Sequence, residues 1–146
     1  MWSKVFLGGF FIGLHWFTFF YAIKIAGVSL TLSMMATGAF ITALIDPLIN
    51  GRKILTYEVF FGGFAAIGIG VIYQAEFEHF FGISIAFLSA FLSALFTILN
   101  GQMVKKVRPI TLSFYELIVG SLLGLIISYF SKTLNIENYM ISDMDI

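Results

Sequence analysis

Five long apolar runs constrain this sequence more than any other feature. They lie at residues 5–24, 28–49, 58–73, 80–101 and 112–130. A helix rises about 1.5 Å per residue, so about 20 apolar residues cross the roughly 30 Å of hydrocarbon in a bilayer. The runs show no two-residue alternation, which predicts helices and not the strands of a membrane barrel. We therefore expect an all-α, polytopic membrane bundle with five transmembrane helices.

The composition supports this fold class and excludes several functions. Of the 146 residues, 60% are hydrophobic and only 11% are charged, against about 25% charged residues in soluble domains. The eight basic and eight acidic residues give zero formal net charge, so no basic field attracts nucleic acid. Cysteine is absent, which excludes disulfides and thiolate sites. The expected partner is the lipid bilayer, without cofactor, metal or nucleic acid.

Loop charge predicts the orientation in the membrane. Six basic residues flank one set of predicted helix ends, namely Lys4, Arg52, Lys53, Lys105, Lys106 and Arg108. Only Lys24 and Lys132 lie at the other ends. Because basic loops stay in the cytoplasm, we predict a cytoplasmic N-terminus and an extracytoplasmic C-terminus in the cytoplasmic (inner) membrane. Residues 1–146 then form a single membrane region whose end, 131–146, is a polar extracytoplasmic tail.

Small residues recur four positions apart on each predicted helix. The sets are Gly9 and Gly13; Ala39 and Ala43; Gly62, Ala66 and Gly70; Ala86, Ala90 and Ala94; and Gly120, Gly124 and Ser128. In lipid, small residues let helix backbones approach closely. We interpret these faces as packing seams of a helix bundle.

Hydroxyl side chains form two further stripes. They are Ser29, Ser33 and Thr37 on the second predicted helix, and Ser89, Ser93 and Thr97 on the fourth, one turn before Asn100. Two interpretations are open. The hydroxyls either bond to carbonyls of their own helix or line a polar cavity between helices.

Ionisable residues inside the apolar runs are expensive and often functional. Glu116 lies about four residues inside the last run. It either reaches the cytoplasmic surface and pairs with Lys105, Lys106 or Arg108, or faces a cavity and binds a proton or cation. Both interpretations remain open at this point.

Two more ionisable residues allow the same pair of interpretations. His15 lies near the middle of the first run, with Thr18 one turn later, and is either a neutral packing residue or a substrate or proton contact. Asp46 precedes Pro47 near the end of the second run, where it either marks a helix end or kink or has a functional role. The candidate substrate or coupling residues are Glu116, His15, Asn100, Asp46, Thr18, Ser33, Thr37, Ser93 and Tyr115.

Motifs for catalysis and nucleotide binding are missing from the sequence. There is no G-x-S-x-G elbow, H-E-x-x-H pair or P-loop, so we expect neither an enzyme nor ATP-driven transport. Movement of a solute would draw on an existing gradient, as in secondary transport.

Five consecutive segments carry a resemblance to a known family. They are Gly13–Trp16 with Phe19–Lys24, Ala43–Leu48 with the basic Arg52 and Lys53, Phe61–Gly70, Leu88–Asn100 and Pro109–Glu116. In this order they resemble the third to seventh helices of the EamA family, in the drug/metabolite transporter superfamily. The resemblance covers nearly the whole chain.

This resemblance implies a ten-helix fold of two inverted five-helix repeats, with a central substrate cavity and alternating access without ATP. We therefore predict a secondary transporter, an exporter of small metabolites, amino acids or drug-like compounds, with a proton or cation as coupling partner. Matching helices three to seven implies a fragment that needs the missing helices or a second copy. The alternative is a non-transporting membrane scaffold or truncated remnant. Asp46 departs from the family, since many relatives carry a longer acid before the proline.

Overall fold

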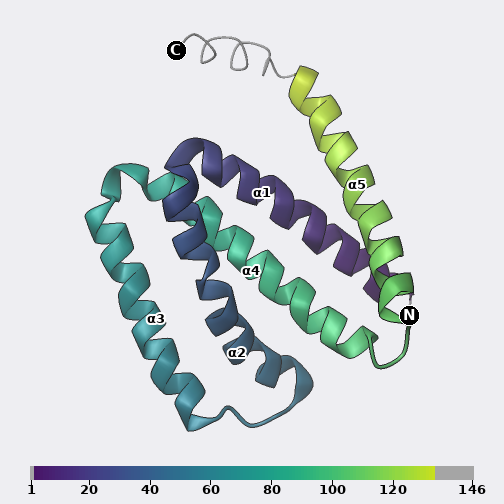
Figure 1. Cartoon of the computed structure of the whole chain (residues 1–146), viewed down its shortest axis with the longest axis horizontal. Coiled ribbons are helices and arrows are strands. Elements are labelled where there is room, and N and C mark those ends of the chain that lie inside the picture. The colour runs from purple at the N-terminus through teal and green to yellow at the C-terminus, as the bar shows by residue number, and fades with distance from the viewer. Residues whose placement is uncertain (1, 134–146) are drawn as a thin grey trace.

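Apolar helices make up almost all of the chain that the structure describes. The structure is a computed structural model, in which residues 2–133 are described (Figure 1). The elements are α1 (Trp2–Met35), α2 (Thr37–Asn50), α3 (Thr56–Ala75), a 3-10 turn at Phe77–His79, α4 (Phe80–Met103) and α5 (Pro109–Thr133). Residues 2–133 contain no strand, which confirms the predicted all-α class. Most of the predicted tail lies outside the described residues, but its first three residues belong to α5.

A sharp kink divides α1 into two arms. Gly27 has φ 81° and ψ 166°, a conformation that glycine adopts without a steric penalty. The chain reverses its direction there, and the second arm continues into α2 (Figure 1). The predicted boundary between the first two runs, at residues 24–28, therefore coincides with this kink.

Four described helices are long and apolar enough to cross a membrane, and α2, with 14 residues, is shorter. The arm of α1 after Gly27 adds the missing length to α2. A turn at Ala36 separates the two pieces, although Ala36 keeps helical dihedrals and its N–H donates to the Leu32 carbonyl at 3.2 Å. The second predicted run is thus a nearly continuous helical path, with an interruption that its sequence did not indicate.

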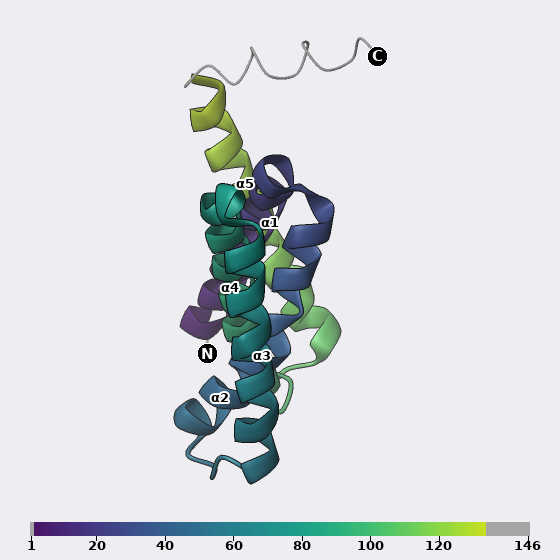
Figure 2. The ribbon, with the colours of Figure 1, turned by 90° about the vertical axis from the view of Figure 1, so that its left-hand side faces the viewer.

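Packing places α4 at the centre of the bundle, against both α1 and α2, while α5 packs on α1 and α3 packs on α2. The α1–α4 contact holds a fully buried cluster of Ala22, Met34, Ile83 and Ala86. The α2–α4 contact buries Ile41, Ala90 and Ala94. Viewed from the side, the helices form a slab that is narrower than it is tall (Figure 2).

Close backbone approaches occur where α1 meets α5. A Cβ added at Gly13 would lie 3.1 Å from the Cα of Gly120, so the two glycines let the helices touch. The predicted seams on these two helices therefore face each other. The seam on α3 is different: a Cβ added at Gly62 would collide with the Phe40 ring, whereas a Cβ added at Gly70 would meet no atom of another described helix within 4 Å. The expected α3 seam is thus mostly uncovered in this part of the chain.

Candidate functional site

Glu116 lies where α1, α4 and α5 meet. Proline begins α5 at position 109, and Glu116 follows in the second turn of that helix. Its side chain is only 2% exposed. A Cβ at Gly8 of α1 would collide with the Glu116 carboxyl, so the glycine provides the space that the carboxyl fills. The carboxyl group is therefore enclosed by helices and does not reach the surface.

Asn100 of α4 is the hydrogen-bond partner of this carboxyl. Its Nδ2 donates to Glu116 Oε2 at 3.2 Å. The other two oxygens of the pair, Glu116 Oε1 and Asn100 Oδ1, are buried and have no hydrogen-bond partner among residues 2–133. A buried polar atom without a partner costs about 1–3 kcal/mol. The pair therefore has unused capacity for a proton or for a ligand that donates hydrogen bonds.

The ion pairs considered for Glu116 do not form among residues 2–133. Lys105, Lys106 and Arg108 make no salt bridge to it. Within the same described range, no group of three or more His, Asp or Glu residues is placed to hold a metal ion. The side-chain oxygens that the hydrogen-bonded Glu116 and Asn100 bring together here belong to one carboxylate and one amide.

His15 is tied to α4 by the neighbouring Ser89. Its Nδ1 lies 2.9 Å from Ser89 Oγ and 3.0 Å from the Ser89 carbonyl oxygen. The Ser89 hydroxyl, which is fully buried, lies 3.0 Å from the His15 carbonyl oxygen. With Nδ1 protonated, the ring donates to Ser89 while the hydroxyl donates to that carbonyl. The geometry matches the packing interpretation of His15, and it adds Ser89, which the sequence indicated only as a member of a hydroxyl stripe.

Three of the candidate hydroxyl groups donate hydrogen bonds to backbone carbonyls three or four residues earlier in the chain. Thr18 donates to the Leu14 carbonyl at 2.9 Å, Thr37 to the Met34 carbonyl at 2.6 Å, and Ser33 to the Ser29 carbonyl at 2.9 Å. Such bonds satisfy a helix hydroxyl without any ligand. For these three residues the own-backbone interpretation describes the structure.

Ser93 lines a pocket of about 440 Å³ between α2 and α4. Its walls are Met35, Gly38, Ala39, Thr42, Ser93, Ala94 and Thr97. Three of these residues carry hydroxyl groups and none carries a charge. Neither Glu116 nor His15 lines this pocket, so the predicted site residues do not converge on one cavity within residues 2–133.

Asp46 belongs to a polar cluster at one end of the bundle. It accepts hydrogen bonds from Asn50 Nδ2 at 2.6 Å and from Arg52 Nε at 3.0 Å. The other guanidinium nitrogens of Arg52 bond both carboxylate oxygens of Glu58, at 2.9 and 2.6 Å. The hydrogen bonds to Glu58 and Asp46 raise the pKa of Arg52, so it remains charged. Asp46 therefore holds the α2–α3 loop, and Pro47 lies inside the last turns of α2.

Glu58 was not identified from the sequence, because Leu55 at the N-cap lacks the hydroxyl of a capping-box signature. Glu58 is the third residue of α3, and its carboxylate accepts a hydrogen bond from the Leu55 N–H at 2.8 Å, as in a capping box.

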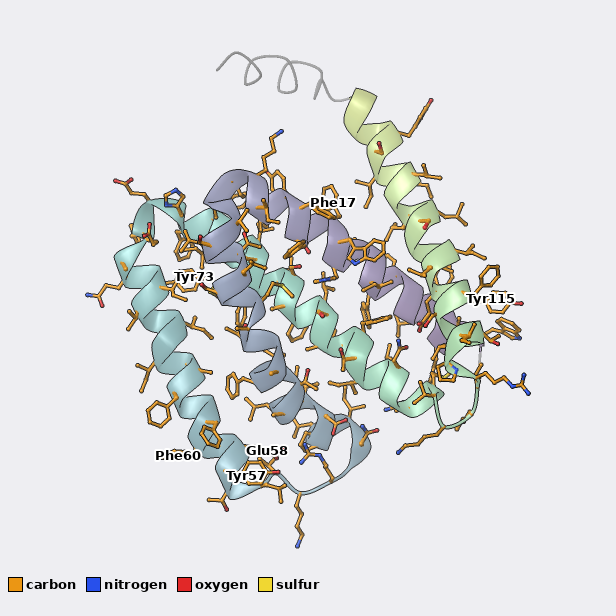
Figure 3. All side chains as sticks on the ribbon, viewed as in Figure 1. Phe17, Tyr57, Glu58, Phe60, Tyr73 and Tyr115 are labelled. Atoms are coloured by element: carbon orange, nitrogen blue, oxygen red, sulfur yellow. The ribbon has the colours of Figure 1, made fainter. Side chains whose placement is uncertain are left out.

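The Tyr115 side chain points away from the helix contact that buries Glu116. It is 40% exposed, contacts the Trp2 ring edge-on at 5.2 Å and projects outward from α5 (Figure 3).

Comparisons with known proteins identify one family. Residues 80–142 match the model of the EamA-like transporter family, a range that includes all of α4 and α5. No curated protein and no solved structure matches the chain. The matched range contains both Asn100 and Glu116, and its two helices are those that the resemblance assigned to the second repeat. The chain is a multi-pass membrane protein by its long apolar helices, and its residues 80–142 are similar to the EamA-like transporter family.

Proposed function

We propose that the chain is part of a secondary transporter that exports small metabolites, amino acids or drug-like compounds from the cytoplasm. The family match supports the transporter class. The concentration of basic residues at one set of helix ends supports a location in the cytoplasmic membrane with the N-terminus inside. No motif for ATP hydrolysis is present in the sequence, which favours a gradient as the energy source.

The observation that carries a coupling role is the buried pair of Glu116 and Asn100. One oxygen of each side chain is enclosed and unpartnered, while Asn100 already donates to the other carboxylate oxygen. A proton on Glu116 Oε1 would give Asn100 Oδ1 a donor. The acid and the amide then form two complementary hydrogen bonds. Loss of the proton leaves both oxygens without partners again.

The position of this pair connects protonation to helix packing. Glu116 is on α5, Asn100 is on α4, and Gly8 of α1 lies against the carboxyl. A change in the separation of α4 and α5 would therefore lengthen or break the acid–amide contact. Rocking of helix groups about a site in the membrane is the established way in which secondary transporters alternate access.

The experiment uses the full-length protein that contains this chain, reconstituted into vesicles that hold a proton gradient. A pH-sensitive dye reports proton flux after addition of a mixture of amino acids as the transport probe. We expect Glu116→Gln to abolish gradient-driven flux and its dependence on pH, because the amide of Gln cannot exchange a proton. The control Glu78→Gln, in the exposed turn between α3 and α4, should leave the flux unchanged. Equal flux in the wild type and Glu116→Gln would contradict the coupling role.

A second candidate function is a non-transporting membrane scaffold. It is favoured by the scattering of the site candidates and by the uncovered small residues of α3, because a Cβ added at Gly63, Gly68 or Gly70 would meet no other described helix within 4 Å. Such a scaffold inserts into vesicles but moves no solute with any variant. The flux measurement on the wild type therefore distinguishes the two functions.

A further inference from the structure

A second polar region lies at the end of the bundle where α1 begins and α2 and α4 end. It is a pocket of about 380 Å³, here named the lysine pocket, lined by Lys4, Asn50, Gln102, Lys105 and Lys106, with Ile49 and Met103 as its apolar part. The Glu116–Asn100 pair is not part of it. No carboxylate lines the pocket, so its electrostatic potential is set by three ammonium groups.

These three cations are not neutralised inside the protein. Among residues 2–133, the salt bridges of the basic end belong to Arg52, which pairs with Asp46 and Glu58. Lys4, Lys105 and Lys106 form no ion pair in that range. Three uncompensated positive charges around one hollow repel each other, and a bound anion would remove this repulsion.

A chain of hydrogen bonds fixes the neutral groups of the pocket. Lys4 Nζ donates to Gln102 Oε1 at 2.7 Å, and Gln102 Nε2 donates to Asn50 Oδ1 at 2.7 Å. Asn50 Nδ2 in turn donates to Asp46. Both amide oxygens that border the pocket are therefore already accepting hydrogen bonds, whereas the ammonium groups of Lys105 and Lys106 donate no hydrogen bond within residues 2–133. The pocket offers donors and few free acceptors, which selects an anion over a cation.

We propose that the lysine pocket binds a phosphate group, supplied by a phospholipid headgroup or by a soluble phosphate compound. Lysine is a common phosphate ligand, and basic pockets between membrane helices on the cytoplasmic side bind anionic headgroups. The apolar Ile49 and Met103 beside the ammonium groups suit a ligand with a hydrocarbon portion. This binding site is independent of the proposed transport activity.

The test is native mass spectrometry of the full chain in mild detergent, titrated with phosphatidylglycerol. A lysine near a membrane surface contributes about fivefold to the binding of an anionic lipid, so Lys105→Gln with Lys106→Gln should weaken binding about thirtyfold. The matched control, Lys53→Gln with Arg108→Gln, removes the same charge from residues outside the pocket and should weaken binding less than about threefold. Each single lysine variant, expected at about fivefold, replaces the double variant if that does not fold.

Two further measurements in the same titration identify the source of the phosphate group and test whether the pocket residues bind it. Competition by millimolar inorganic phosphate indicates a soluble ligand, and resistance to it indicates the lipid headgroup. Gln102→Leu keeps the net charge but removes the oxygen that positions the Lys4 ammonium group beside the pocket, so it should also weaken binding by about threefold. Equal losses in the pocket and control variants, or no binding of either phosphatidylglycerol or inorganic phosphate, would overturn the proposal.

Discussion

Helices α3 and α4 are both long and apolar enough to cross a membrane, yet they differ in what surrounds them. Of the most apolar window in each, 44% of residues are buried in the α4 segment and 6% in α3. Both helices carry small residues at four-residue spacing. On α4 these face other helices, so that Ala86 and Ala90 are fully buried. On α3 only Gly62 is buried. Small residues therefore permit close packing but do not by themselves determine which helix packs there.

The attachments of α3 are correspondingly few. Near its start, Glu58 bonds Arg52, and near its end Tyr73 lies 3.1 Å from the Ser84 hydroxyl of α4. Tyr57 and Phe60 of this helix are 59% and 61% exposed. The bundle thus consists of a packed group, α1, α4 and α5 with α2, and a peripheral helix.

The largest difference in stability between the packed group and α3 is expected from glycine substitutions. A side chain at Gly9 collides with Val119 and with the Glu116 carbonyl oxygen. Gly9→Leu should therefore lower the free energy of unfolding by about 3 kcal/mol or more. Gly70→Leu, in open space on α3, should change it by less than about 0.5 kcal/mol. Thermal unfolding in detergent, followed by circular dichroism, measures both. Similar losses in the two variants would show that α3 is packed as tightly as α1.

A smaller difference is expected between two serines of α4. Ser89 is buried and bonded to His15 of α1, whereas Ser84 bonds to Tyr73 of α3. Ser89→Ala should lower the free energy of unfolding by about 1 kcal/mol, because the His15 ring and carbonyl oxygen lose the Ser89 hydroxyl as a hydrogen-bond partner. Ser84→Ala should cost less than about 0.5 kcal/mol. The same unfolding assay tests this pair, and a larger loss for Ser84→Ala would contradict the ranking of the two contacts.

The smallest effect concerns the loop that connects α2 to α3. Arg52→Gln removes the bonds to Asp46 and Glu58 but should leave global unfolding almost unchanged, because ion pairs with one solvent-exposed partner contribute little. Amide hydrogen exchange at residues 55–58 should become about threefold faster, since the Glu58 carboxylate loses the guanidinium that holds it. Lys53→Gln, without such bonds, is the control. Unchanged exchange in Arg52→Gln would show that the first turn of α3 is held by other contacts.

The helical class was predictable because hydrocarbon-length apolar runs have few alternatives in a bilayer. The reversal near residues 24–28 also followed from the sequence, and Gly27 supplies it by its positive φ. The interruption at Ala36 was not predictable, because alanine carries no helix-breaking signal. Of the site candidates, Glu116 and Asn100 lie in contact, while Tyr115 is adjacent in sequence but faces outward.

The sequence by itself determined where the chain can be helical, which end of each helix is basic, and which residues are expensive to place among lipids. These properties depend on local composition and on the length of the apolar runs. The tertiary structure decided that Glu116 meets Asn100, that Ser89 bonds His15, and that α3 stays peripheral. Those outcomes depend on which helices approach each other, and small-residue spacing alone does not specify the opposing helix. An apolar run shows that a helix lies in lipid. Which helices pack together depends on the shapes and polar partners of their surfaces, and these meet only in the folded bundle.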